Sequence, residues 1–235
     1  MVIAPGTSVS GVFYCPFLMQ TNMTSLQLNT KINIMYNNSD TEIIFSSNNS
    51  LEIPVLLSSM QTMNGILQPI GIWGTQCRAK SSAATWLFYV DDYRFTSLIN
   101  DPAQVIRTGC DCAAEPNFSL FDSTPIAEGV VKIYRKRWIG RYWQEHGIRV
   151  YADLNVPRKF AEFNKLGIPK GYNSFATRGY SDRIEDLDFE LSIAREISGC
   201  QEPNLIVYGG GKKVKEWCVA NSLLYVEPFK PGVKR

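Results

Sequence analysis

Three aspartates and a glycine-rich turn are the residues of this sequence best suited to chemistry on a phosphate. Asp91, Asp92 and Asp153 each end or follow a short apolar run, and carboxylate oxygens are the ligands that Mg²⁺ prefers. A turn at a predicted helix start can offer backbone N–H groups to a phosphate, and it consists of Gly209, Gly210, Gly211 and Lys212. A metal ion beside a bound phosphate would support phosphoryl chemistry. The three aspartates are therefore the catalytic candidates, with Mg²⁺ as the cofactor they would suit.

Each of these features also has a structural interpretation. Asp92 can cap a helix that begins at Tyr93, and three glycines after a strand can form only a tight turn. If the aspartates and the glycine-rich turn lie together at one end of the sheet, a functional role is favoured. Further polar residues stand at the ends of the same apolar runs, and we expect them to line one site: Asn117, Ser119, Asn155, Thr177 and Arg178.

Apolar runs alternate with helical patterns from residue 84 onward, which predicts repeated βα units. We expect strands at 85–90, 110–115, 149–153, 174–177, 205–208 and 223–226, and helices at 93–100, 125–146, 158–166, 183–198 and 212–221. The predicted fold is α/β, with a mainly parallel sheet that is open or forms a partial barrel. In such folds the loops after the carboxyl ends of the strands converge, so the polar residues above would meet there.

The helix predicted at 125–146 is long and basic. Its apolar residues recur at helical spacing, which predicts a stripe that packs on the sheet: Ala127, Val130, Val131, Tyr134, Trp138 and Tyr142. Cationic and aromatic residues fall mainly outside this stripe and would suit nucleic acid: Arg135, Lys136, Arg137, Arg141 and Trp143. The alternative is that acidic residues between 182 and 202 neutralise this charge within the protein.

Residues 1–75 differ in composition from residues 76–235. They contain one basic and three acidic residues, and alternating apolar residues between 26 and 45 predict a pair of strands. We therefore expect a β-rich N-terminal region at 1–75 and an α/β domain at 76–235.

The remaining composition excludes several classes of protein. There is no apolar run long enough to span a membrane and no signal-peptide pattern, so we expect a cytoplasmic protein without a membrane partner, in the host cell if it is viral. The six cysteines are scattered, which predicts reduced thiols. His146 is the single histidine, which argues against common zinc sites and a Ser-His-Asp triad.

Five motifs, in order, resemble a family known only as a domain of unknown function in phages, plasmids and bacteria. They lie at residues 90–95, 116–125, 134–148, 167–171 and 207–210, and the resemblance covers about residues 84–228. At Asn117 the family pattern leads us to expect an aspartate. The resemblance implies a mobile-element setting and supplies no catalytic residues.

Three functions remain open on the sequence. The first is a phage or mobile-element protein that binds nucleic acid through the basic helix, for example in replication. The second is a metal-dependent enzyme that acts on a phosphate-containing substrate. The third is a virion-associated structural protein, suggested by the nearly uncharged N-terminal region.

Overall fold

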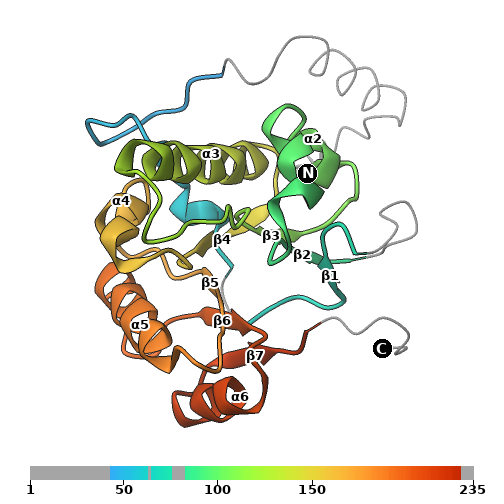
Figure 1. The fold of residues 1–235 in the computed structure, drawn as a ribbon. Helices are drawn as coiled ribbons and strands as arrows, with labels where there is room; N and C mark the ends of the chain where they lie inside the picture. The colour runs from blue at the N-terminus through green and yellow to red at the C-terminus, as the bar shows by residue number, and fades with distance from the viewer. Residues whose placement is uncertain (1–42, 63–64, 76–82, 229–235) are drawn as a thin grey trace, which may run out of the picture. The chain divides into compact units, whose positions relative to one another are not determined.

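The sheet is all-parallel and its strands follow one another in chain order. The computed structural model describes residues 43–62, 65–75 and 83–228. Seven strands pair in the order β1 to β7 and every pair is parallel. The strands are β1 (Ile70–Ile72), β2 (Thr85–Leu87), β3 (Cys112–Ala114), β4 (Arg149–Asp153), β5 (Phe175–Arg178), β6 (Leu205–Tyr208) and β7 (Leu224–Val226). Figure 1 shows that the sheet curls into a half-barrel, which confirms the predicted fold class.

All six predicted strands are present, and β1 is an additional one. Its sequence is Ile-Gly-Ile, too short for a strand pattern to be recognised. Gly71 is needed here because a Cβ atom would lie 2.5 Å from the side chain of Trp86 on β2. The glycine therefore allows this edge strand to pack tightly against its neighbour.

The helices occupy the predicted connections. The longest ones are α3 (Ile126–Glu145), α5 (Ile184–Ser198) and α6 (Gly211–Ala220). The segment predicted as a helix at 93–100 forms two 3-10 turns, η4 (Asp92–Arg94) and η5 (Thr96–Ile99), and is followed by the short α2 (Ala103–Ile106). The segment predicted at 158–166 divides into η6 (Arg158–Phe160) and α4 (Ala161–Lys165). No helix in the described ranges is both long and apolar enough to cross a membrane.

Side chains alternate between two buried faces of the sheet. On β5, Phe175 packs with Leu187 and Leu191 of α5, whereas Ala176 packs with Tyr151 of β4 on the opposite face. Helices cover the first face, and strand side chains mainly fill the second, as in the interior of a small barrel (Figure 1). Side chains on both faces are buried, which is why the strands read as continuous apolar runs.

The described part of the expected N-terminal region packs against this sheet and its helices. Ile53 and Leu56 are buried, and the Leu56 N–H donates to the Gly167 carbonyl at 2.8 Å. The described residues of this region belong to the same compact unit as the α/β domain. The strand pair predicted between 26 and 45 lies almost wholly outside the described residues.

The predicted orientation of α3 is wrong. Ala127 and Val131 belong to the predicted sheet-facing stripe but are exposed, Val131 by 45%. Trp138 and Tyr142 of the stripe are buried, but they stack on each other, and Trp138 packs on Phe45 and donates to the Ile43 carbonyl at 2.8 Å. The buried face instead contains Gly129, Lys136 and Gly140. A Cβ atom at residue 129 would lie 2.1 Å from the ring of Phe160, so the glycine permits close packing. Hydrophobicity alone misplaced this face because it treats buried cations as surface residues.

Candidate functional site

A polar cavity lies at the carboxyl ends of the strands. Its volume is about 430 Å³, and it is lined by the loops after β2, β3, β4 and β5 and by α5. The lining includes Asp91, Asn117, Ser119, Asn155, Arg178 and Glu190. The parallel strand order therefore brings most of the predicted polar set to one cavity. Asp153 and Thr177 are fully buried behind it.

Asp153 is the centre of a buried hydrogen-bond network at the end of β4. One carboxylate oxygen accepts bonds from Lys136 Nζ at 2.8 Å and Asn117 Nδ2 at 3.1 Å. The other accepts from the Tyr89 hydroxyl at 3.1 Å and the Asn155 N–H at 3.3 Å. Burial, followed by the nearby Asp153 charge, raises the pKa of Tyr89 well above its usual value. Tyr89 is thus a neutral donor, and Asp153 is held by internal partners.

A second buried ion pair lies directly behind the first. Arg137 Nη1 contacts Glu115 Oε1 at 2.8 Å, and the other Glu115 oxygen accepts the Asp153 N–H at 3.0 Å. Burial raises the pKa of Glu115, while the charges of Arg137 and Lys136 oppose that rise. Arg137 also donates to the Asn164 carbonyl at 2.7 Å. These bonds fix α3 to the strand ends.

The residues predicted to contact nucleic acid are mostly inside the protein. Lys136, Arg137, Arg141 and Trp143 are 2%, 0%, 8% and 0% exposed. Arg141 donates to the Val55 carbonyl at 2.6 Å, and Trp143 Nε1 donates to the Pro102 carbonyl at 2.9 Å. Only Arg135 of this set is exposed. The expectation that they form a contact surface is corrected, because each buried member has partners within the fold.

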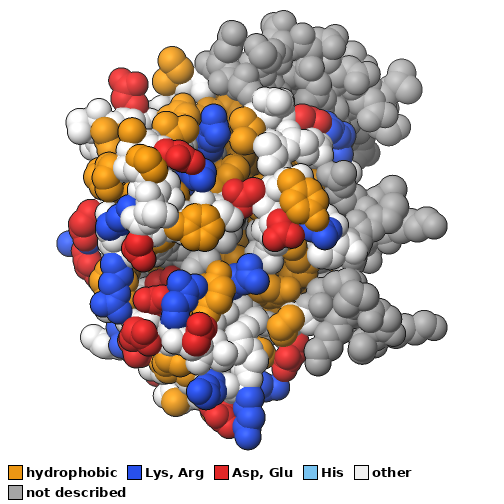
Figure 2. All heavy atoms as spheres, viewed as in Figure 1, with side chains coloured by type: hydrophobic (Ala, Val, Ile, Leu, Met, Phe, Trp, Pro, Cys, Tyr) orange, Lys and Arg blue, Asp and Glu red, His pale blue; other side chains and the backbone are white. Residues whose placement is uncertain are grey.

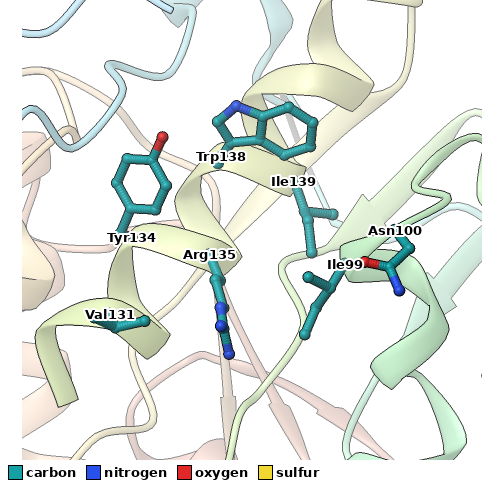
Figure 3. A pocket seen from close by; sticks show the side chains of 7 residues that line it. All are labelled: Ile99, Asn100, Val131, Tyr134, Arg135, Trp138 and Ile139. Atoms are coloured by element: carbon teal, nitrogen blue, oxygen red, sulfur yellow. The ribbon is translucent and has the colours of Figure 1, made fainter. Parts of the chain in front are cut away.

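Arg135 lies at a separate pocket on the outer face of α3. Figure 3 shows this pocket, of about 320 Å³, between α3 and the end of η5. It is lined mainly by apolar side chains, and Ile139 of α3 faces Ile99 across it. Figure 2 shows Lys and Arg side chains interspersed with Asp and Glu on the described part of the visible face. That face carries no continuous basic surface.

Asp91 and Asp92 have different environments. Both carboxylate oxygens of Asp92 accept the Ser119 N–H at 3.1 Å, and one also accepts the Ser119 hydroxyl at 2.8 Å. Asp92 therefore fixes the loop after β3. The Asp91 side chain is 75% exposed, 4.0 Å from Arg94, and lines the cavity. Across the described residues, no three His, Cys, Asp or Glu side chains are grouped as metal ligands. The three aspartates do not form an Mg²⁺ site by themselves.

The three-glycine turn joins β6 to α6 outside the cavity. Gly209, Gly210 and Gly211 all have positive φ, and a Cβ atom on Gly210 would lie 2.7 Å from the Gly179 backbone. Lys212 is 88% exposed and 3.7 Å from Glu216. The turn thus has a packing role, and none of its residues lines the cavity.

Arginines on the cavity wall make it suitable for an anion. Arg178 and Arg183 both lie over the Tyr180 ring, at 5.3 and 4.1 Å from its centroid. Arg183 and Arg158 each have Asp186 within 4 Å, at 3.7 and 3.8 Å. Among the described residues, Arg178 has no carboxylate within that distance. Its guanidinium is therefore available to a ligand.

Glu190 is a cavity residue that the sequence analysis missed. It is 4% exposed and accepts the Thr177 hydroxyl at 2.5 Å. Burial is the main cause that raises its pKa well above the usual carboxyl value. One signal was present in the sequence: Glu190 lies at helical spacing with Leu187, Leu191 and Ala194, so it interrupts the apolar face of α5.

The chain belongs to a family described as a domain of unknown function, DUF4417, which matches residues 45–222. It is similar to the Gene 1 protein of Mycobacterium phage D29, with 32% identity over 128 residues that cover 52% of this chain and 47% of the relative. The Gene 1 protein of Mycobacterium phage L5 is also 32% identical over 128 residues, covering 52% of this chain and 56% of the relative. The chain spans about half the length of these curated relatives, and no solved structure matches it significantly. The predicted family resemblance is confirmed, and the protein is phage-related.

Proposed function

We propose that this phage-related member of the DUF4417 family is an enzyme that acts on a phosphate-containing substrate in the cavity at the strand ends. The observation that carries the proposal is Arg178, a cavity arginine without a carboxylate within 4 Å among the described residues. A guanidinium binds a phosphate through paired hydrogen bonds. Active sites of parallel α/β folds lie at this end of the sheet.

The size and lining of the cavity suit a bound small molecule or the phosphorylated end of a nucleic-acid strand. A volume of about 430 Å³ falls within the usual range for ligand sites. Asn117 and Asn155 are bonded to each other at 3.2 Å and supply amide groups on one wall. Phe121 also lines the cavity and is 63% exposed, so it offers a face on which a base can stack.

A buried carboxyl group at the same cavity supports catalysis over simple binding. Strongly perturbed carboxyl groups in clefts are typical of acid–base chemistry. Glu190 meets this description through its burial and its position on the cavity wall. Asp91, Asp122 and Asp186 also line the cavity, and Asp91 remains a catalytic candidate. Asp153 would act indirectly, by positioning Asn117 and Asn155.

Other parts of the earlier predictions receive less support. A metal-dependent mechanism would need ligands beyond Asp91, Asp92 and Asp153, which are not grouped as metal ligands in the described part of the chain. The predicted contact residues on α3 do not support nucleic-acid binding, since Lys136, Arg137, Arg141 and Trp143 are buried and only Arg135 is exposed. Nucleic acid stays in the proposal only as one source of a terminal phosphate, with replication as one setting for such an enzyme.

The test is binding of phosphate-containing probes to the wild type and to Arg178→Ala. Inorganic phosphate, a nucleoside monophosphate and a 5′-phosphorylated oligonucleotide would be compared by calorimetry at one low salt concentration. Loss of a charged hydrogen-bond partner costs about 1.5–3 kcal/mol, which corresponds to roughly 10- to 150-fold weaker binding. The probe that binds most tightly identifies the source of the phosphate.

Arg135→Ala is the matched control, because Arg135 is an exposed arginine on the outer face of α3. It should leave the affinity for every probe unchanged. Equal losses in Arg135→Ala and Arg178→Ala would contradict the cavity as the binding site. Failure of all three probes to bind the wild type would reject the proposed function.

A further inference from the structure

The carboxyl group of Glu190 shares a cavity with cations yet forms no ion pair among the described residues. Arg178 and Arg183 line the same cavity, but neither lies within 4 Å of a Glu190 oxygen. The only hydrogen bond in the described structure that involves its side chain comes from Thr177 Oγ1 at 2.5 Å. The side chain is nearly fully buried and still contributes to the cavity wall. Such a group is poorly solvated when ionised.

Charged and polar groups surround Glu190 on four elements and on the open side of the cavity. Asp153 on β4 and Asp186 on α5 are anionic neighbours that disfavour a second negative charge. Lys136 on α3 acts in the opposite sense, but its ammonium group is bonded to Asp153 at 2.8 Å. Thr177 on β5 donates to the carboxyl group and favours its ionised form. On the open side, Arg158, Arg178 and Arg183 and the carboxylates Asp91 and Asp122 surround the space for a ligand.

We propose that Glu190 is the proton switch of this cavity: an anionic ligand binds beside Arg178 when Glu190 is protonated and is repelled when Glu190 is ionised. This inference rests on the proposed function, because it needs the cavity to accept an anion. It assigns a role to Glu190 and makes anion binding depend on pH, neither of which the family resemblance implies. The protonated carboxyl group can also donate a hydrogen bond to a ligand oxygen.

The affinity for an anion should fall as pH rises, because the form of Glu190 that permits binding is the protonated one. Burial keeps the proton on Glu190 above the usual carboxyl pKa, so the binding-competent form dominates at low pH. As pH rises through the raised pKa of Glu190, the carboxylate forms and the affinity for an anion falls. For one proton, the loss approaches about tenfold for each pH unit above that pKa.

Sulfate is the sharpest probe, because it keeps its double negative charge where phosphate itself titrates. Its affinity for the wild type would be measured between about pH 5 and pH 9. Glu190→Gln keeps a hydrogen-bonding group of the same size without a charge, so it should bind sulfate at all of these pH values with a nearly flat profile. Thr177→Val removes the donor that favours the ionised form, so its profile should keep the wild-type shape with a midpoint at higher pH.

The outcomes separate this inference from the proposed function. A pH-dependent wild type with a flat Glu190→Gln profile supports both proposals. Sulfate binding that depends on Arg178 but has the same pH profile in the wild type and Glu190→Gln overturns the switch and keeps the binding site. No sulfate or phosphate binding by the folded wild type overturns both.

Discussion

Lys136 Nζ lies 2.8 Å from Asp153 Oδ2, and the two side chains are 3% and 0% exposed. The pair joins the middle of α3 to the carboxyl end of β4, directly behind the candidate site. The same ammonium group donates to the Asp153 carbonyl at 2.9 Å. A residue that looks like part of a basic surface in the sequence is therefore the internal partner of a buried carboxylate.

Replacing Lys136 with methionine should strongly destabilise the protein. The substitution keeps most of the side-chain volume but leaves Asp153 buried without its cation, which costs about 3–5 kcal/mol. Urea unfolding of Lys136→Met and of Arg135→Met measures the difference. The exposed Arg135 should change the free energy of unfolding by about 0.5 kcal/mol or less. Similar stabilities of the two variants would show that the buried pair is not formed.

Alanine at Gly210 should destabilise more than alanine at Gly147. Both glycines have φ of +87°, so each substitution forces a non-glycine residue into the left-handed region at a cost of about 1–2 kcal/mol. At Gly210 the new Cβ would also lie 2.4 Å from Val214, whereas nothing lies within 4 Å at Gly147. Overpacking adds about 1–3 kcal/mol. Equal losses in thermal or urea unfolding would contradict the close approach of Gly210 to Val214 and to the Gly179 backbone, 2.7 Å from the new Cβ.

Glu190→Gln should stabilise the protein increasingly as pH rises. The pKa of Glu190 is raised in the folded state, so folded protein holds this proton at pH values where unfolded chains have lost it. The wild type therefore loses stability from about pH 4.3, the usual glutamate pKa, up to the raised pKa. Glutamine lacks this proton equilibrium. The measurement is the free energy of unfolding of both proteins across that window.

Comparison of the two proteins isolates Glu190, because Glu115 also has a raised pKa and contributes to the pH dependence of both. The slope of the difference between them cannot exceed about 1.4 kcal/mol per pH unit for one proton. A constant difference in stability at all pH values would refute a raised pKa at Glu190.

Alkylation should distinguish Cys200 from the other described cysteines. All four described cysteines are free, but only Cys200 is exposed. Burial raises the pKa of Cys110, Cys112 and Cys218 to about 11. Because the thiolate is the reactive form, each would react at least about 100-fold more slowly than a thiol of ordinary pKa. Mass spectrometry of the native and the urea-unfolded protein after brief alkylation gives the order in which the cysteines are labelled. Labelling of Cys218 as early as Cys200 in the native protein would contradict this packing.

The sequence by itself determined the parallel α/β fold and the place where its polar residues gather. Strands at 149–153 and 205–208 match the structure residue for residue. The reason is that a sheet buried on both faces requires continuous apolar runs, and a parallel connection requires a helix between them. These are local properties of the chain. Asn117, Asn155 and Arg178 were also found because they follow such runs and meet at one end of the sheet.

Only the tertiary structure decided which way α3 faces and what its charges do. Arg137 pairs with Glu115, 22 residues away, and Lys136 pairs with Asp153, 17 residues away. A cation is buried when a carboxylate is fixed opposite it, and that juxtaposition exists only after the strands have paired. The same holds for Glu190, whose buried carboxyl group accepts a hydrogen bond from Thr177 at the end of β5. Local patterns identify which residues can be charged, whereas packing decides which of those charges meet a partner, water or a ligand.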